Sequence, residues 1–187
     1  MTRAPTQRPG GRSARVQQAV HMAALTLSEQ HERGRITVPM IANEAGVTPS
    51  TIYRRWGDVN EIFADISIER LRPRIAPRRT GSLRGDLTAW AQDYLEKIST
   101  PAGCAALQDV LMSDTSATSP AGSKMFQCAY FSRTQIDTIL ARWPGSHTVD
   151  TDSVIDHVLS PMVYRTLFEP TPFPQQRISE LIDRVVR

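Results

Sequence analysis

The sequence contains few cysteines, few lysines and no long apolar run. Its 187 residues include two cysteines, Cys104 and Cys128, too few for a disulfide framework or a four-ligand zinc site. No apolar stretch approaches the roughly 18 residues that a membrane span requires. Residues 1–18 also lack the apolar segment of a signal peptide. We therefore expect a cytoplasmic protein that has no membrane partner.

Signatures of catalysis are missing as well. The sequence has no G-x-S-x-G elbow, Walker loop, G-x-G-x-x-G turn, H-E-x-x-H motif or paired cysteine motif. His157 has no second Cys or His three or four residues away, as a helical metal site would need. These absences predict no catalytic residue, no metal and no cofactor. A small helical enzyme acting on an apolar substrate remains the alternative.

Charge is divided unevenly along the chain. Residues 1–80 hold 13 Arg and 7 acidic residues, a net charge of +6, whereas residues 81–187 hold 9 basic and 12 acidic residues, a net charge of −3. This asymmetry predicts a polyanionic partner at the N-terminal end, with chance variation as the alternative. The arginines form no continuous stripe and there are only two lysines, which disfavours an architectural protein that binds DNA without regard to sequence.

Apolar residues recur at spacings of three and four, and no segment alternates with a period of two. This pattern predicts an all-α fold of about nine helices, a small N-terminal bundle followed by a larger one. The expected organisation is a disordered basic arm at 1–12, a small bundle at 13–58, a connecting helix and linker at 59–80, and a larger bundle at 81–187. The helices are expected at 13–32, 38–44, 49–56, 59–71, 82–99, 102–113, 122–143, 152–168 and 174–186.

The most informative segment covers residues 37–63 and has helix-turn-helix spacing. Ala42, Gly46 and Ile52 lie at offsets of 0, 4 and 10, as expected for a close helix contact, a tight turn and a packing residue. The other face of the second helix carries Ser50, Thr51, Tyr53, Arg54 and Arg55. Hydroxyls and guanidinium groups bind phosphates and guanine edges in the major groove, although an ordinary αα-hairpin is the alternative.

Residues 14–63 resemble the DNA-binding domain of tetracycline-repressor (TetR) family transcription regulators. The matching segments are Ala23-Ala24-Leu25, Thr37-Val38, Ile41-Ala42, the turn at 45–48 and the helix at 51–56. Members of this family usually carry a Lys in a Phe-x-x-Lys-Glu pattern after the recognition helix. This sequence has Trp56, Val59 and Asn60 at the matching positions, so the phosphate contact of that Lys is not transferred.

The resemblance implies a homodimer on a pseudo-palindromic operator, with one recognition helix per subunit in successive major grooves. It also implies an effector-binding C-terminal domain and, as the commoner mode, repression that the effector relieves; an activator of the same family is the alternative. The expected DNA-binding residues are Arg12 and Arg15 in the minor groove; Thr37, Thr48 and Tyr53 on the backbone; Pro49, Ser50 and Arg54 on base edges; Arg55 on either; and Thr51 on the same helix face.

The C-terminal half offers an apolar helix face and a candidate pocket. Leu83, Leu87, Trp90, Tyr94 and Ile98 lie on one helix face, which favours plain core packing. The pocket alternative would suit a small apolar or aromatic effector, with a lining of Trp90, Tyr94, Leu107, Leu111, Met112, Met125, Phe126 and Phe131. The last two helices resemble the family's dimer-forming pair, with Val154, Val158, Met162, Ile178, Leu181, Ile182 and Val185 expected at the interface.

Overall fold

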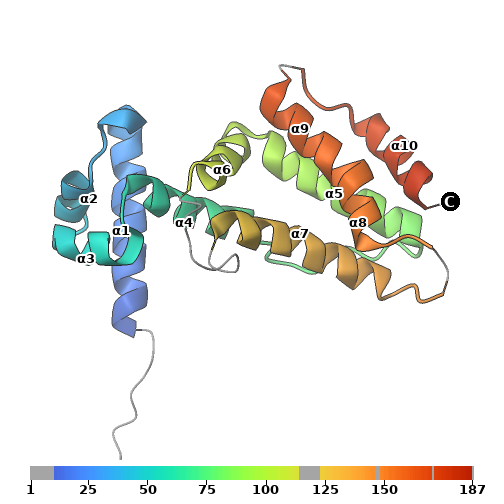
Figure 1. Ribbon diagram of the computed structural model, residues 1–187, viewed down its shortest axis with the longest axis horizontal. Coiled ribbons are helices and arrows are strands. Elements are labelled where there is room, and N and C mark those ends of the chain that lie inside the picture. The colour runs from blue at the N-terminus through green and yellow to red at the C-terminus, as the bar shows by residue number, and fades with distance from the viewer. Residues whose placement is uncertain (1–10, 114–122, 146–147, 170, 187) are drawn as a thin grey trace, which may run out of the picture. The chain divides into compact units, whose positions relative to one another are not determined.

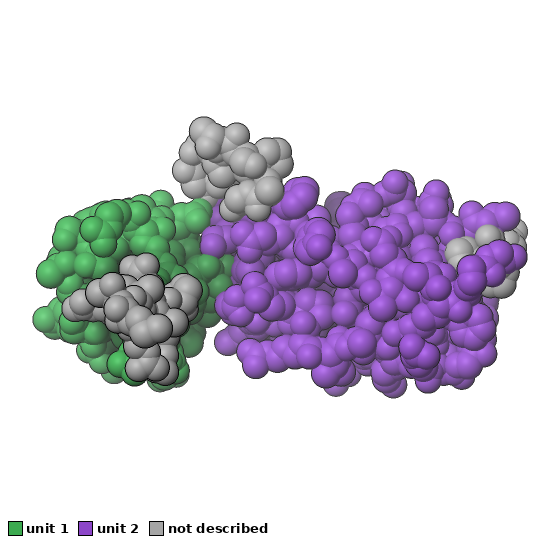
Figure 2. Space-filling model, turned by 90° about the horizontal axis from the view of Figure 1, so that it is seen from below, with its two compact units in different colours: residues 1–66 green, residues 67–187 purple. Residues whose placement is uncertain are grey.

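The computed structural model describes residues 11–113, 123–145, 148–169 and 171–186. Residues 1–10 of the arm predicted at 1–12 therefore lie outside the described residues, and Gly11 and Arg12 form the start of a helix instead. Among the described residues every regular element is a helix, and nine α-helices result when the continuous stretch 151–168 is counted once. The predicted all-α fold is confirmed. The chain divides into two compact units, residues 1–66 (the first unit) and 67–187 (the second unit), coloured separately in Figure 2.

The first unit is a small helical bundle. It contains α1 (Gly11–Gln30), a 3₁₀ turn (Arg33–Arg35), α2 (Val38–Glu44), α3 (Pro49–Trp56) and most of α4 (Val59–Leu71). Its core joins apolar side chains from all four helices, including Val20, Ile41, Ile52 and Ile62, each of which is fully buried. The Arg33 guanidinium stacks 3.8 Å from the centre of the Phe63 ring and ties the 3₁₀ turn to α4.

Two glycines make the turns around α3. Gly46, between α2 and α3, has a φ of +65°, and Gly57, after α3, has a φ of +83°. Residues with a Cβ rarely adopt these conformations, so both positions favour glycine. Pro49 opens α3, where its missing N–H costs no intrahelical hydrogen bond. These local features fix the length and direction of the eight-residue helix α3.

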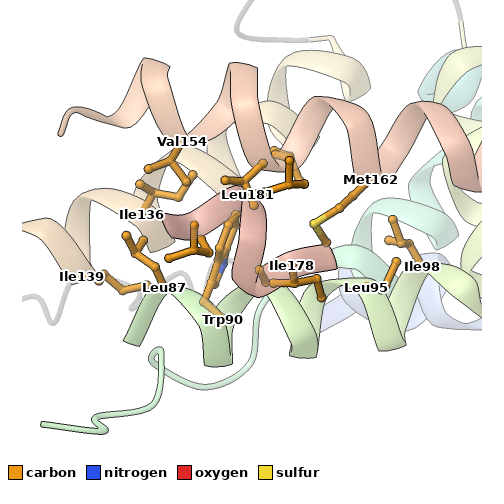
Figure 3. Packing of buried hydrophobic residues seen from close by; sticks show 14 of the residues in the cluster. Leu87, Trp90, Leu95, Ile98, Ile136, Ile139, Val154, Met162, Ile178 and Leu181 are labelled. Atoms are coloured by element: carbon orange, nitrogen blue, oxygen red, sulfur yellow. The ribbon is translucent and has the colours of Figure 1, made fainter. Parts of the chain in front are cut away.

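The second unit is built around α5 (Leu83–Ser99). This helix contacts α6 (Pro101–Leu111), α7 (Lys124–Leu140), α9 (Ser160–Phe168) and α10 (Gln175–Val185), as Figure 1 shows. Figure 3 shows the resulting core, in which Leu87, Ile136, Met162 and Ile178 from four different helices converge. Burial of such side chains stabilises each by about 1.5–3 kcal/mol relative to exposure to water.

The stretch between α8 (Thr151–Val154) and α9 is a π-helical turn, Ile155–Leu159. The Ser160 N–H bonds the carbonyl of Ile155, five residues back. Pro161 follows at once, and its ring has no N–H to donate to the carbonyl four residues before it. The wider turn therefore accommodates the proline while Val158 and Met162 stay buried.

A buried carboxylate, Asp86, connects the linker that precedes α5 to the residues that follow α7. Asp86 is 1% exposed and accepts hydrogen bonds from the Thr80 N–H at 2.6 Å, the Thr80 hydroxyl at 2.9 Å and the Trp143 indole at 3.4 Å. Arg142 donates to Asp86 at 3.2 Å and also to the carbonyls of Pro77 and Arg78. Burial by itself raises the pKa of Asp86, but these hydrogen bonds outweigh it and lower that pKa.

Candidate nucleic-acid interface and ligand cavity

Helix α3 turns one face to the core and a polar face to solvent. Ile52 is fully buried and Trp56 is 7% exposed, so the inner face fixes the rotation of the helix. Pro49, Ser50, Tyr53 and Arg54 are exposed on the outer face, and Thr48 is exposed just before it. The structure thus brings five of the predicted DNA-binding residues together on one surface.

Three hydroxyl groups cluster at the start of α3. The Thr48 hydroxyl lies 3.0 Å from that of Ser50 and 2.9 Å from that of Thr51, and makes no capping bond to the backbone. Each hydroxyl can donate as well as accept, and the first N–H groups of a helix have no intrahelical acceptor. This end of α3 can therefore bind a phosphate or the acceptor edge of a base.

The two arginines of α3 have different surroundings. Arg54 is exposed, and its guanidinium has no carboxylate or hydrogen-bond partner within the described residues. Arg55 instead donates to the carbonyl and hydroxyl of Ser13 at 2.9 and 3.1 Å and to the Gln17 side chain. It also lies 4.7 Å from the centre of the Trp56 ring. Arg54 is therefore free for a ligand, whereas Arg55 is engaged in joining α3 to α1.

The remaining predicted contacts lie outside α3. The exposed Thr37 precedes α2, and its hydroxyl accepts a hydrogen bond from the Met40 N–H at 3.4 Å. Arg15 is exposed on α1. Arg12 lies in the first turn of α1, and its side chain is outside the described residues.

A carboxylate that the sequence analysis did not select joins three helices of the first unit. The Asp65 Oδ2 atom of α4 accepts from the Trp56 indole at 3.1 Å and the Gln17 amide at 3.1 Å, and lies 3.0 Å from His21 Nε2. Since Gln17 also accepts from Arg55, one polar network links α1, α3 and α4. In the sequence, Asp65 lies three residues from both Ile62 and Ile68, on the apolar face of the helix. An acidic residue on an apolar face is the sequence feature that could have identified it.

The second unit contains a cavity of about 400 Å³, a size typical of small-molecule sites. The linker after α4, α5 and α7 provide its walls, which include Trp90, Tyr94 and Phe131. Tyr94 and Ser132 are hydrogen-bonded, and burial raises the pKa of Tyr94, so this phenol stays neutral. Four charged residues also line the cavity: Lys97, Arg74, Arg78 and Asp93. None of them was predicted from the sequence, although Lys97 lies on the same face of α5 as Trp90 and Tyr94.

Only part of the predicted pocket lining faces this cavity. Trp90, Tyr94 and Phe131 do, whereas Leu107 is buried in the core and Met125 packs against it. Leu111, Met112 and Phe126 are exposed to solvent. Periodicity identified the apolar faces of these helices, but it could not tell which apolar residue meets the cavity.

The predicted interface residues on the last helices point inward. Val154, Val158, Met162, Ile178 and Ile182 are fully buried, Leu181 is 8% exposed and Val185 is partly buried, all in the core of the second unit. The first six side chains are therefore unavailable to a second chain in this structure. Tyr164 and Phe168, 60% and 69% exposed, form a ring pair 5.1 Å apart on the outer face of α9.

No helix in the described part of the chain is both long and apolar enough to cross a membrane.

Comparisons with known proteins agree with this architecture. Residues 22–66 match the family model for bacterial regulatory proteins of the tetR family, and residues 77–185 match that for the tetracyclin repressor-like C-terminal domain. An uncharacterized HTH-type transcriptional regulator of Mycobacterium tuberculosis is 24% identical over 168 residues, covering 87% of this chain and 81% of the relative.

Solved structures share the fold. A TetR transcriptional regulator from Rhodococcus sp. RHA1 superposes with a TM-score of 0.58 at 16% identity and covers 94% of this chain and 97% of its own. The SmeT–triclosan complex has a TM-score of 0.51 at 17% identity, and the match covers 91% of this chain and 89% of that structure's chain. With the helix-turn-helix geometry of α2 and α3 and the two matching family models, the chain belongs to the TetR family of bacterial regulators and is a DNA-binding transcriptional regulator.

Proposed function

We propose that the protein is a repressor that binds a pseudo-palindromic operator as a homodimer and is released by a small effector. The observation that carries this proposal is the exposed polar face of α3, on which Arg54 has no partner among the described residues. A guanidinium that is free of protein partners can bind the O6 and N7 atoms of guanine in a bidentate manner. We assign Pro49, Ser50 and Arg54 to base edges and Thr37, Thr48, Thr51 and Tyr53 to the DNA backbone.

The arginines outside the centre of α3 have supporting roles in this proposal. Arg15, and Arg12 three residues before it, contact the minor groove or its phosphates. Arg55 holds α3 against α1 through Ser13 and Gln17 and adds positive charge close to the backbone. A regulator that reads chromosomal DNA works in the cytoplasm, and no catalytic role is assigned to any residue.

The cavity of the second unit is the proposed effector site. Its aromatic walls, Trp90, Tyr94 and Phe131, can hold an apolar or aromatic body. Leu71, the last residue of α4, also lines the cavity, and the same helix carries Asp65, which bonds Trp56 of α3. An effector that shifts α4 would thereby change the presentation of α3, provided that its affinity differs between the two states.

We assign the dimer contact to the outer face of α9. Tyr164 and Phe168 are large, exposed and adjacent, and aromatic residues are enriched where protein surfaces meet. A second copy of the chain is the proposed occupant because two half-sites require two recognition helices. The buried residues Val158 and Leu181 would then act indirectly, by shaping the helices that carry this face.

Selection of bound duplexes from a random pool tests the DNA-binding proposal. The expected product is an inverted repeat whose half-site centres are about 34–36 Å apart, one helical turn, or a multiple of it. A single unrepeated site would contradict the dimer, and recovery of no enriched sequence at low salt would contradict sequence-specific binding altogether.

Sedimentation tests the interface. Tyr164→Glu should yield monomers that remain folded, because this side chain is 60% exposed and is not part of the core of the second unit. Tyr53→Glu, on α3 and similarly exposed at 52%, is the matched control and should stay dimeric. An unchanged dimer in Tyr164→Glu would refute the assignment of this face.

A further inference from the structure

The cavity is lined by aromatic residues and by four charged residues, and the charges of these four do not cancel. Arg78 and Asp93 neutralise one another, with Arg78 Nε 3.0 Å from Asp93 Oδ2 and Nη2 2.7 Å from Oδ1. The two other charged groups of the lining, Lys97 and Arg74, are both cationic. Neither of them has a carboxylate partner within the described residues. The aromatic walls therefore border an edge with an uncompensated positive charge.

Lys97 is the inner of the two cations. It is partly buried on α5, and its Nζ donates to the carbonyls of Leu71 at 3.1 Å and of Arg72 at 3.4 Å. An ammonium group carries three N–H donors, so these two bonds leave one donor for another acceptor. Burial, followed by the charge of Arg74, lowers the pKa of Lys97. An anion beside Lys97 would remove that unfavourable electrostatic environment.

The neighbouring polar groups of the cavity do not supply this anion. Burial raises the pKa of the Cys128 thiol and that of the Tyr94 phenol, so both groups stay neutral near pH 7. Ser132 is hydrogen-bonded to Tyr94, and the Gln135 amide donates to the Ile75 carbonyl at 3.2 Å. Within the described lining, Asp93 is the one acidic group, and Arg78 already engages both of its oxygens.

We propose that the cavity takes an amphipathic carboxylate, with the carboxylate on Lys97 and Arg74 and an aromatic or alkyl body against Trp90, Tyr94 and Phe131. This inference narrows the proposed effector from an apolar or aromatic molecule to an amphipathic carboxylate. Only the effect of that ligand on operator binding rests on the proposed function. Binding itself can be measured without DNA, so failure of the two proposals can be told apart.

The position of Lys97 also gives the ligand a route to α4. The two carbonyls that Lys97 holds belong to the last residue of α4 and to the residue after it. A ligand carboxylate is a stronger acceptor for an ammonium than a neutral carbonyl is. A ligand carboxylate on the remaining donor therefore pulls the ammonium toward the cavity, weakens its hydrogen bonds to these two carbonyls and changes how the end of α4 is held within the second unit.

Lysine NMR on the full chain tests this directly, because the sequence has only two lysines, Lys97 and Lys124. With ¹³C-labelled lysine, each Cε signal reports the titration of its own ammonium group. Saturation with biphenyl-4-carboxylate or decanoate should raise the pKa of Lys97 by about one unit or more. Lys124, which is not part of the lining, should not respond, and the uncharged amides of the same two acids should not raise the pKa of Lys97.

Calorimetric titration with the same two acids and their amides supplies the affinity comparison. At least one acid should bind about tenfold or more tightly than its amide, as charge-assisted hydrogen bonds are the stronger ones. Lys97→Met should abolish this preference, Lys97→Arg should retain it, and Lys124→Met is the charge-matched control that should leave it intact. Equal or tighter binding of the amides, an unmoved Lys97 signal, or no binding of either acid at 1 mM would overturn the proposal.

Discussion

The two candidate sites of this protein are assembled in different ways. The proposed DNA-binding face comes mainly from one short stretch, residues 48–54, whose side chains are brought together by the start of α3 and the residue that precedes it. The cavity draws its walls from residues between Leu71 and Gln135, on a linker and two helices that meet only after folding. Sites of the first kind can be recognised from spacing, whereas sites of the second kind depend on tertiary packing.

The polar groups beneath the two surfaces differ in the same manner. Asp65 in the first unit joins the side chains of three helices and fixes how α3 lies against α1 and α4. Asp86 in the second unit holds a linker, through Thr80 and Arg142, at the entrance to α5. Removing each acid should therefore damage a different part of the molecule.

The largest effect is expected for Asp86→Ala. The substitution leaves the partly buried Arg142 without its carboxylate and should cost about 3–5 kcal/mol of stability. Hydrogen exchange should show the loss in the second unit, while amides of α1 to α3 keep their protection. Asp93→Ala removes an acid from an exposed pair on the same helix and should cost less than about 1 kcal/mol. Equal losses in the two variants would contradict the role given to Asp86.

The same carboxylate predicts a dependence on pH. Because the folded-state pKa of Asp86 is depressed, its stabilisation is present above the unfolded pKa, about 3.9, and is lost as pH falls through the folded value. The stability of the second unit, measured by urea unfolding, should therefore fall below about pH 4. The Asp86→Asn variant should be less stable at neutral pH and should show a flatter acid profile; an unchanged profile would argue against the assignment.

A smaller effect is expected for Asp65→Ala. Trp56, Gln17 and His21 would lose their shared acceptor, at a cost of about 1–3 kcal/mol to the first unit. Operator affinity should fall together with stability, because α3 is no longer fixed by α4. Glu29→Ala removes the same charge from an exposed position on α1 and should change neither quantity. Loss of operator affinity in both variants would show that the change in net charge, and not the loss of the Asp65 hydrogen bonds, causes the effect.

The helix-turn-helix geometry could be predicted because its determinants are local. Gly46, Pro49 and the alternation of Ile52 and Trp56 with exposed polar residues fix the turn, the start and the inner face of α3. Arg54 and Arg55 looked alike in the sequence, however, since only the fold brings Ser13 and Gln17 beside Arg55. A pattern of exposed residues shows which side chains are available but not which are already bound.

The second unit was less predictable for the same reason. Its apolar periodicity correctly indicated helices, but an apolar face can meet a core, a cavity or a partner chain. Val158 and Ile182 turned out to lie in the core, and Leu111 and Phe126 on the surface. The cationic wall, Lys97 and Arg74, combines a helix residue with a linker residue, and no sequence spacing connects the two.

The central claim, that α3 reads DNA sequence through Arg54, is tested by measuring the affinity of wild-type, Arg54→Ala and Arg55→Ala protein for the selected operator and for duplexes with each base pair changed. Arg54→Ala should lose about 1–3 kcal/mol on the operator and should stop discriminating at one base-pair position. Arg55→Ala should weaken binding to all duplexes alike. A uniform loss across all sequences for Arg54→Ala, or wild-type protein that binds every duplex equally, would contradict the account.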